Sequence, residues 1–230
     1  MTKRRGGIEM QRRTMAGLGI PAALALLLVM GVVLVAGVWL SQQQGDPYAS
    51  LSPELRAMLW PEPRPVAPFQ LVDHHAEPFT EERLKGQWTF LFFGYAGCPD
   101  VCPMALRDMS DVRKVLARDG LDDEAQFVFM TVDPERDTVE LLSGYVPFFD
   151  EEMIGVTGPR EEVDALTRQM AVMAVRVDDD ESDFYHFDHT SSVLLIDPRG
   201  RVVGAFSPPH IPERMAEHFT ALRNLRAFSK

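Results

Sequence analysis

The sequence contains two cysteines, Cys98 and Cys102, separated by three residues in the segment FFGYAGCPDVCP. Two thiols at this spacing could form a structural disulfide, bind a soft metal ion together, or exchange electrons with a partner thiol. A disulfide that closes so short a loop removes little entropy from the unfolded chain and therefore adds little stability. We therefore interpret the pair as a chemical site. Thioredoxin-type reductases have two residues between their cysteines, whereas this chain has three.

The residues around the cysteines favour a soft metal ion. Pro103 fits the first position of a helix, where its missing N–H costs nothing, and this would place Cys102 at the N-cap. The unpaired N–H groups of a helix N-terminus favour the thiolate over the thiol. Two thiolates suit Cu(I), and one imidazole would complete a trigonal site, whereas structural zinc takes four ligands.

The third ligand must come from six histidines. His186 and His189 lie in the segment YHFDHT, directly before a predicted strand over 192–196. In a thioredoxin-like sheet, the loop before this strand lies against the cysteine loop, so we expect one of these two to be the ligand. Their positions alone leave open which one it is. We interpret the other four as surface or loop residues: His74, His75, His210 and His218.

The pattern of apolar residues predicts an α/β domain. Continuous apolar runs over 88–93 and 127–132 are typical of strands buried on both faces of a sheet. Further strands are predicted over 69–72 and 192–196, and residues 202–206 return as the hairpin partner of the latter. Helices are predicted over 103–117, from Asp137 or Thr138 through 142, from 159 and from 212. This order predicts a thioredoxin-like fold, with a central mixed sheet flanked by helices and a β-hairpin.

The N-terminal part predicts a membrane anchor. Residues 15–40 carry no charge and are long enough to cross a bilayer, and the residues before them carry five basic side chains against one acidic one. We expect residues 1–14 in the cytoplasm, a transmembrane helix over 15–40, a Pro- and Gln-rich tether over 41–67, and an exported domain over 68–230. In a bacterium this location is the inner membrane and the periplasm. The whole chain has a net charge of −11; without the five basic residues and one acidic residue before the anchor, the rest has a net charge of −15, which argues against nucleic acid as a partner.

Three stretches stand out by their residues: FGYAGCPDVCP at 93–103, VDPERDT at 132–138, and DHT at 188–190 followed by LIDPRG at 195–200. Together, in this order, they resemble the Sco/SenC family, the membrane-tethered copper proteins needed for assembly of cytochrome c oxidase. The resemblance implies that Cys98, Cys102 and His189 bind one copper ion, Cu(I) or Cu(II), and that His186 is a neighbour. It further implies a copper metallochaperone that serves the dinuclear copper centre of oxidase subunit II. A periplasmic copper donor and a thiol reductant would be its other partners.

Several alternatives stay open. A membrane-anchored thiol–disulfide reductase would need both cysteines but not His189, and a peroxidase fits less well because residues 94–103 contain no arginine. Many family members have Thr-His where this chain has Ala96-Gly97, which removes a polar group beside the dithiol but no proposed ligand. Asp133 could orient the ligands or modulate docking, or it could be a simple turn residue. We interpret the acidic run over 178–183 as a solvated loop, and Met104 lies near the cysteines in sequence.

Overall fold

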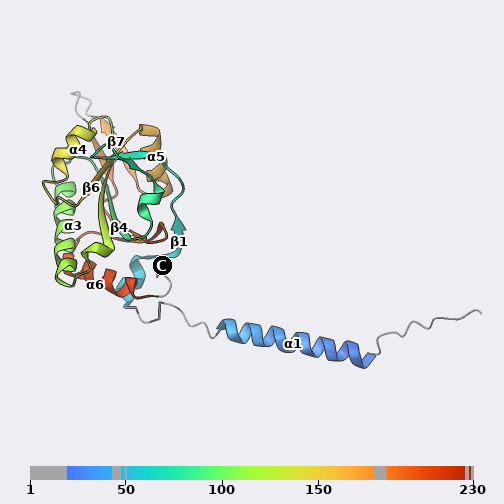
Figure 1. Cartoon of the computed structure of the whole chain (residues 1–230). Coiled ribbons are helices and arrows are strands. Elements are labelled where there is room, and N and C mark those ends of the chain that lie inside the picture. Colours follow the sequence, from blue (N-terminus) through green and yellow to red (C-terminus); the bar gives the residue numbers. More distant parts are fainter. Residues whose placement is uncertain (1–19, 43–47, 50, 179–184, 226–227, 229–230) are drawn as a thin grey trace, which may run out of the picture. The chain divides into compact units, whose positions relative to one another are not determined.

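The computed structural model describes residues 20–42, 48–49, 51–178, 185–225 and 228. The chain divides into two compact units, Met1–Ala49 and Ser50–Lys230 (Figure 1). The first unit contains helix α1 (Ile20–Gln42). Within the described residues, no helix combines the length and the apolar character needed to cross a membrane. The predicted anchor over 15–40 is therefore not confirmed, and the basic segment 1–14 lies outside the described residues.

The second unit alternates strands and helices around one eight-stranded sheet. Its order along the sheet is β1-β10-β9-β4-β5-β6-β2-β3. In chain order, the elements are α2 (Pro53–Met58), β1 (Leu59–Pro65), β2 (Leu71–Asp73), β3 (Pro78–Phe79), β4 (Trp88–Gly94), α3 (Val101–Arg118), β5 (Ala125–Thr131), α4 (Val139–Tyr145), β6 (Ile154–Thr157), α5 (Arg160–Gln169), β7 (Ala174–Asp178), β8 (Tyr185–His189), β9 (Val193–Asp197), β10 (Arg201–Phe206) and α6 (Pro212–Arg223).

The sheet is mixed, as predicted. Strand β5 runs parallel to β4 and β6, whereas β9 runs antiparallel to both β4 and β10. Figure 1 shows α3 and α6 on one side of the sheet and α5 on the other. Every residue of β4 and β5 is buried, because helices cover both faces of these central strands. The rigid end of β4 carries the loop that holds the cysteines.

Residues 53–65 differ from the prediction of an unfolded tether. They form α2 and β1, and β1 pairs antiparallel with β10 at the edge of the sheet. Three of the seven residues of β1 are prolines, which suggested an extended linker. An edge strand tolerates proline, because one side of the strand needs no ladder hydrogen bonds. The folded domain therefore begins well before residue 68.

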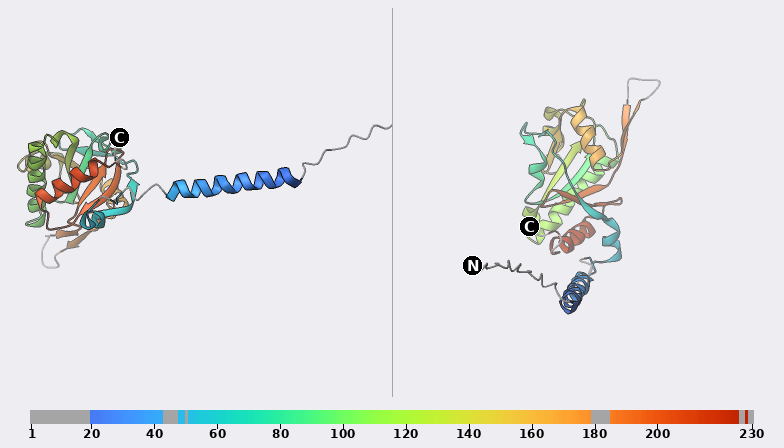
Figure 2. Two further views of the ribbon diagram at one scale, coloured as in Figure 1. Left: turned by 90° about the horizontal axis from the view of Figure 1, so that it is seen from below. Right: turned by 90° about the vertical axis from the view of Figure 1, so that its right-hand side faces the viewer.

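Two local predictions near the cysteines also need correction. Helix α3 begins at Val101, so Cys102 lies within its first turn rather than at the cap. Pro103 is tolerated there because the first-turn N–H groups of a helix have no intrahelical partner. Residues 185–189, expected to be a loop, form strand β8 of a separate two-stranded sheet with β7. Figure 2 (right) shows this hairpin projecting from the body of the domain.

Candidate metal centre

The structure brings together the three side chains that the sequence indicated as ligands. Cys98 lies in the loop after β4, Cys102 in the first turn of α3, and His189 at the end of β8. One ligand atom from each lies within 4.8 Å of the others, and the Cys102 Sγ to His189 Nε2 distance is 3.3 Å. Both thiols are free. His186 does not belong to this group, and its side chain lies 3.7 Å from the exposed carboxylate of Asp188.

This arrangement fits a three-coordinate soft metal ion. Bonds of roughly 2.0–2.3 Å to nitrogen and sulfur, as for zinc, place three ligands of a trigonal site about 3.5–4 Å apart. All three ligand atoms lie within 4.8 Å of one another, and the Cys102 to His189 distance of 3.3 Å is close to this spacing. Within the described residues, no second group of cysteine, histidine or acidic side chains has comparable geometry.

The ring of His189 is oriented by its neighbours. Its Nδ1 lies 3.1 Å from the backbone carbonyl of Thr190, which can only accept a hydrogen bond. In the neutral ring Nδ1 therefore carries the proton, and the lone pair of Nε2 faces Cys102. Burial lowers the pKa of His189 below its ordinary value of 6.5, although the Thr190 carbonyl opposes this effect. The ring packs edge-on against Phe92 and Tyr95, with centroid distances of 5.9 and 6.0 Å.

Cys102 and Cys98 differ in exposure. Cys102 is fully buried, whereas 8% of Cys98 is accessible. Burial raises the pKa of the Cys102 thiol well above its ordinary value. Desolvation of Cys102 therefore opposes the preference for a thiolate that is expected at a helix N-terminus.

Gly94 leaves the space that the Cys102 sulfur occupies. A Cβ atom at this position would lie 2.8 Å from Cys102 Sγ, 2.9 Å from Phe92 and 3.1 Å from Phe129. These distances are far shorter than the roughly 3.5–4.0 Å of an ordinary contact between carbon atoms. The last residue of β4 must therefore lack a side chain if the sulfur is to sit above the strand end.

Asp137 holds the cysteine loop in place through a hydrogen bond to its backbone. Its buried carboxylate accepts hydrogen bonds from the Ala96 N–H at 2.9 Å and from the Thr131 hydroxyl at 2.6 Å. Burial raises the pKa of Asp137, while these two hydrogen bonds oppose the rise. The sequence suggested Asp137 or Thr138 as a helix cap, and Thr138 caps α4 through its side chain. Nothing in the local sequence pattern distinguishes a cap from a loop anchor, so the role of Asp137 was missed.

Asp133 lies outside the group of ligands and secures the hairpin that carries His189. Its fully buried carboxylate accepts a hydrogen bond from the Tyr185 hydroxyl at 3.1 Å and forms an ion pair with Arg136. The Arg136 guanidinium also lies over the Tyr185 ring, 3.7 Å from its centroid, and donates to the Tyr185 carbonyl. Asp133 thus acts on the site through β8 and not by contact with a ligand atom.

The remaining residues singled out in the sequence are not part of the centre. Met104 is 51% exposed on α3, and Asp100 makes no capping hydrogen bond with its side chain. Most of the acidic run over 178–183 lies outside the described residues. His74 lies in the turn after β2, as expected, although its side chain is buried; His218 lies on α6 and is buried, which corrects the expectation of a surface position. Although these two histidines are buried, neither belongs to the group of candidate ligands around the thiols.

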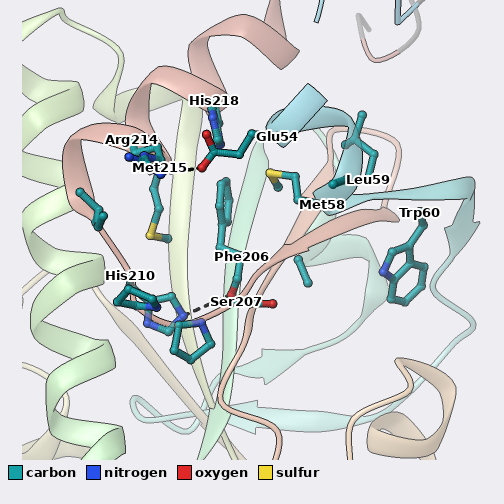
Figure 3. A pocket seen from close by; sticks show the side chains of 15 residues that line it. Glu54, Met58, Leu59, Trp60, Phe206, Ser207, His210, Arg214, Met215 and His218 are labelled. Atoms are coloured by element: carbon teal, nitrogen blue, oxygen red, sulfur yellow. Dashed lines mark hydrogen bonds and ion pairs between the residues drawn. The ribbon is translucent and has the colours of Figure 1, made fainter. Parts of the chain in front are cut away.

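A separate cavity of about 540 Å³ lies between α6, residues 54–60 and the loop after β10 (Figure 3). Figure 3 shows Phe206 between Met58 and Met215, with the ion pair of Glu54 and Arg214 above them, 2.6 Å long. His210 Nε2 donates to the Phe206 carbonyl at 3.2 Å. None of the three candidate ligands lines this cavity.

Comparison with known proteins agrees with this geometry. A model of the SCO1/SenC family matches residues 61–224. The chain belongs to the SCO1/SenC family. The resemblance inferred from three short motifs is thereby confirmed across most of the chain.

Individual members of the family show how far the likeness extends. The chain is 37% identical over 139 residues to the mitochondrial SCO1 homolog of Mus musculus, which covers 60% of this chain but only 49% of the mouse protein. It is 32% identical over 160 residues to a putative copper-binding protein of Stutzerimonas stutzeri, covering 70% of this chain and 78% of that relative. The structure of Bradyrhizobium japonicum ScoI with copper bound superposes with a TM-score of 0.63 at 35% identity, covering 68% of this chain and 98% of that one.

Proposed function

We propose that this protein is a copper metallochaperone that delivers copper to the dinuclear copper site of cytochrome c oxidase subunit II. The observation that carries the proposal is the neutral His189 imidazole aimed at two free thiols, because this donor set is the one that soft copper prefers. Copper-bound relatives with this fold support the choice of metal. The oxidase as acceptor rests on the family resemblance of the sequence motifs.

The three side chains have different roles in this proposal. Cys102 has no exposed surface and is the innermost of the three ligands. Cys98 lies nearer the surface and His189 is only half-buried, so ligands of a partner reach the ion from their side. Copper is cargo here: it leaves when partner ligands replace these two bonds one after the other, which a three-coordinate site allows without a fully dissociated ion.

A thiol–disulfide reductase is the second candidate. It is favoured by one observation, the two free thiols whose sulfur atoms lie within 4.8 Å of each other. Such a pair can close a disulfide after a modest rotation and pass two electrons to a partner disulfide. This activity needs Cys98 and Cys102 but makes no use of the orientation of His189.

Replacement of His189 by alanine separates the two functions. His189→Ala removes one of three metal bonds, so we expect Cu(I) affinity to fall by at least the 10–100-fold that is typical of losing even an outer-shell partner. The thiol–disulfide potential should stay within roughly 30 mV of the wild type. The matched control is His186→Ala, because His186 lies on the same strand outside the group of ligands. Normal oxidase assembly by His189→Ala cells at limiting copper would exclude the chaperone and favour the reductase.

The location of the domain is a further proposal. The charge asymmetry around residues 15–40 supports an N-terminus in the cytoplasm and a periplasmic C-terminal domain. A reporter fused after Lys230 should be active only if it requires export. Activity of a reporter that works only in the cytoplasm would overturn this topology.

A further inference from the structure

The cavity of about 540 Å³ between α6, residues 54–60 and the loop after β10 has the size and the walls of a ligand site. Small-molecule sites are typically clefts of roughly 300–1,000 Å³ with mostly apolar walls and a few polar groups. Aromatic rings, thioethers and prolines line this one: Trp60, Phe206, Met58, Met215, Pro208 and Pro209. Such walls favour a flat aromatic ring, because aromatic faces stack and thioether sulfur makes favourable contacts with rings.

His218 on α6 gives the cavity a hydrogen-bonding group that has no partner. Its side chain lines the cavity and is only 9% exposed, with its ring stacked on Phe206 at a centroid distance of 6.3 Å and 15° from parallel. Within the described part of the chain, neither ring nitrogen forms a hydrogen bond or an ion pair, and neither is fully enclosed. A buried polar group without a partner calls for an explanation, and the open side of this ring is the cavity (Figure 3).

The other polar groups of the wall are already paired. His210 Nε2 donates to the Phe206 carbonyl. Glu54 and Arg214 are the two charged residues of the lining, and they form an ion pair 2.6 Å long with each other. The cavity therefore has no net charge to offer, which favours a neutral ligand over an acidic or basic one.

The group that suits His218 is a hydroxyl. A neutral imidazole donates from one nitrogen and accepts at the other, and a hydroxyl can both donate and accept, so it fits either nitrogen. Water could also bond the ring, but it would leave the apolar walls hydrated. An aromatic ring that carries a hydroxyl satisfies His218 and removes the walls from water at the same time.

We propose that this cavity binds a neutral aromatic molecule whose hydroxyl group forms a hydrogen bond with His218. The inference goes beyond the proposed copper function and does not depend on it. His218 selects the hydroxyl, and the rings, thioethers and prolines of the wall select the aromatic body. Because the space is larger than a single phenol ring, a fused ring system fits it better than a tyrosine side chain of a partner.

The test measures binding of 2-naphthol to the full-length wild type and to His218→Phe by isothermal titration calorimetry. The phenylalanine ring keeps the stacking on Phe206 and has no nitrogen, so we expect affinity for 2-naphthol to fall about fivefold, the net value of one hydrogen bond between neutral groups. 2-Methylnaphthalene, in which a methyl group replaces the hydroxyl, should bind both proteins equally well. This second probe shows that the cavity persists in the variant, and binding elsewhere on the chain cancels between the two proteins.

His210→Phe is the matched control, because His210 lines the same cavity and its Nε2 is already bonded. Any loss in this variant should affect the two probes alike. An equal loss of both probes in His218→Phe would assign the effect to packing and overturn the hydrogen bond.

Two further probes test the class of ligand. 2-Naphthoate should bind the wild type more weakly than 2-naphthol, since Arg214 is already paired with Glu54. N-acetyltyrosinamide should also bind more weakly, because its single ring covers less of the wall. Tighter binding of the naphthoate would overturn the neutral ligand, and tighter binding of the tyrosine derivative would replace the small molecule by a tyrosine of a partner protein. No binding of 2-naphthol by the wild type would overturn the inference as a whole.

Discussion

Replacement of Gly94 by alanine should disturb both the metal site and the packing of the hydrophobic core. The new methyl group would lie 2.8 Å from Cys102 Sγ and 2.9 Å from the Phe92 ring, both of which are fully buried. Against an ordinary contact of roughly 3.5–4.0 Å, each overlap is of the order of 0.6 Å or more. Because Phe129 closes the third side at 3.1 Å, the sulfur and the rings must move apart.

The magnitude follows from the cost of overpacking. An extra methyl group in a well-packed core costs about 1–3 kcal/mol. In a domain of this size each kcal/mol lowers the melting temperature by about 2–4 °C, so we expect a fall of roughly 2–12 °C for metal-free Gly94→Ala. Displacement of the Cys102 sulfur should also lower Cu(I) affinity by about tenfold or more. Thermal unfolding and a competition titration on the same preparation measure both effects.

Gly97→Ala is the control within the same loop. Its Cβ would meet only the Tyr95 ring, at 3.7 and 3.8 Å, which is ordinary contact. Restricting the unfolded chain should leave this variant as stable as the wild type, or more stable by about 0.4–1 kcal/mol. Equal melting temperatures for the two variants would refute the overpacking argument. A destabilised Gly94→Ala protein with unchanged copper affinity would show that Gly94 makes room for the rings and not for the sulfur.

Three further predictions concern the thiols and His189. Because burial raises the pKa of Cys102, copper must displace its proton, so Cu(I) affinity should rise at least tenfold per pH unit between pH 6 and 8; a flat profile would contradict this. Because burial lowers the pKa of His189, the folded protein resists protonation there, and metal-free stability should fall as pH drops below about 6.5, less so in His189→Ala; denaturant titrations at pH 5 and 7 measure the difference. Air oxidation should join Cys98 to Cys102, seen by mass spectrometry as a loss of two hydrogens, and the oxidised protein should no longer take up copper. The reduced protein should bind one copper ion per chain in a titration. A fully oxidised protein that still binds copper, or a titration that ends at two tightly bound ions, would count against the site.

Much of the domain could be predicted because its signals are local. The apolar runs of β4 and β5 and the helical stripe of α3 are visible in the sequence, since burial on both faces or on one face imposes a fixed period. The segment 53–65 could not be predicted in this way. Its prolines suit a free extended tether and an edge strand equally well, and only the presence of β10 beside it decides between them.

The choice between His186 and His189 shows the same limit at the metal centre. The two residues are three positions apart in β8, and side chains at odd separations point to opposite faces of a strand. Local sequence does not reveal that this segment is a strand or which of its faces meets Cys102. The family resemblance selected His189, and the fold supplies the physical reason, because His189 shares its face with the buried Phe187.

Residue types at short spacing are enough to identify the dithiol, its position at the end of a buried strand, and the family to which the chain belongs. The behaviour of the site depends instead on residues that the fold brings together. Burial raises the pKa of Cys102, and the carboxylate of Asp137 accepts a hydrogen bond from the Ala96 N–H in the cysteine loop. Each of these properties arises from side chains distant in sequence, since desolvation and hydrogen bonding depend on what surrounds a group in space.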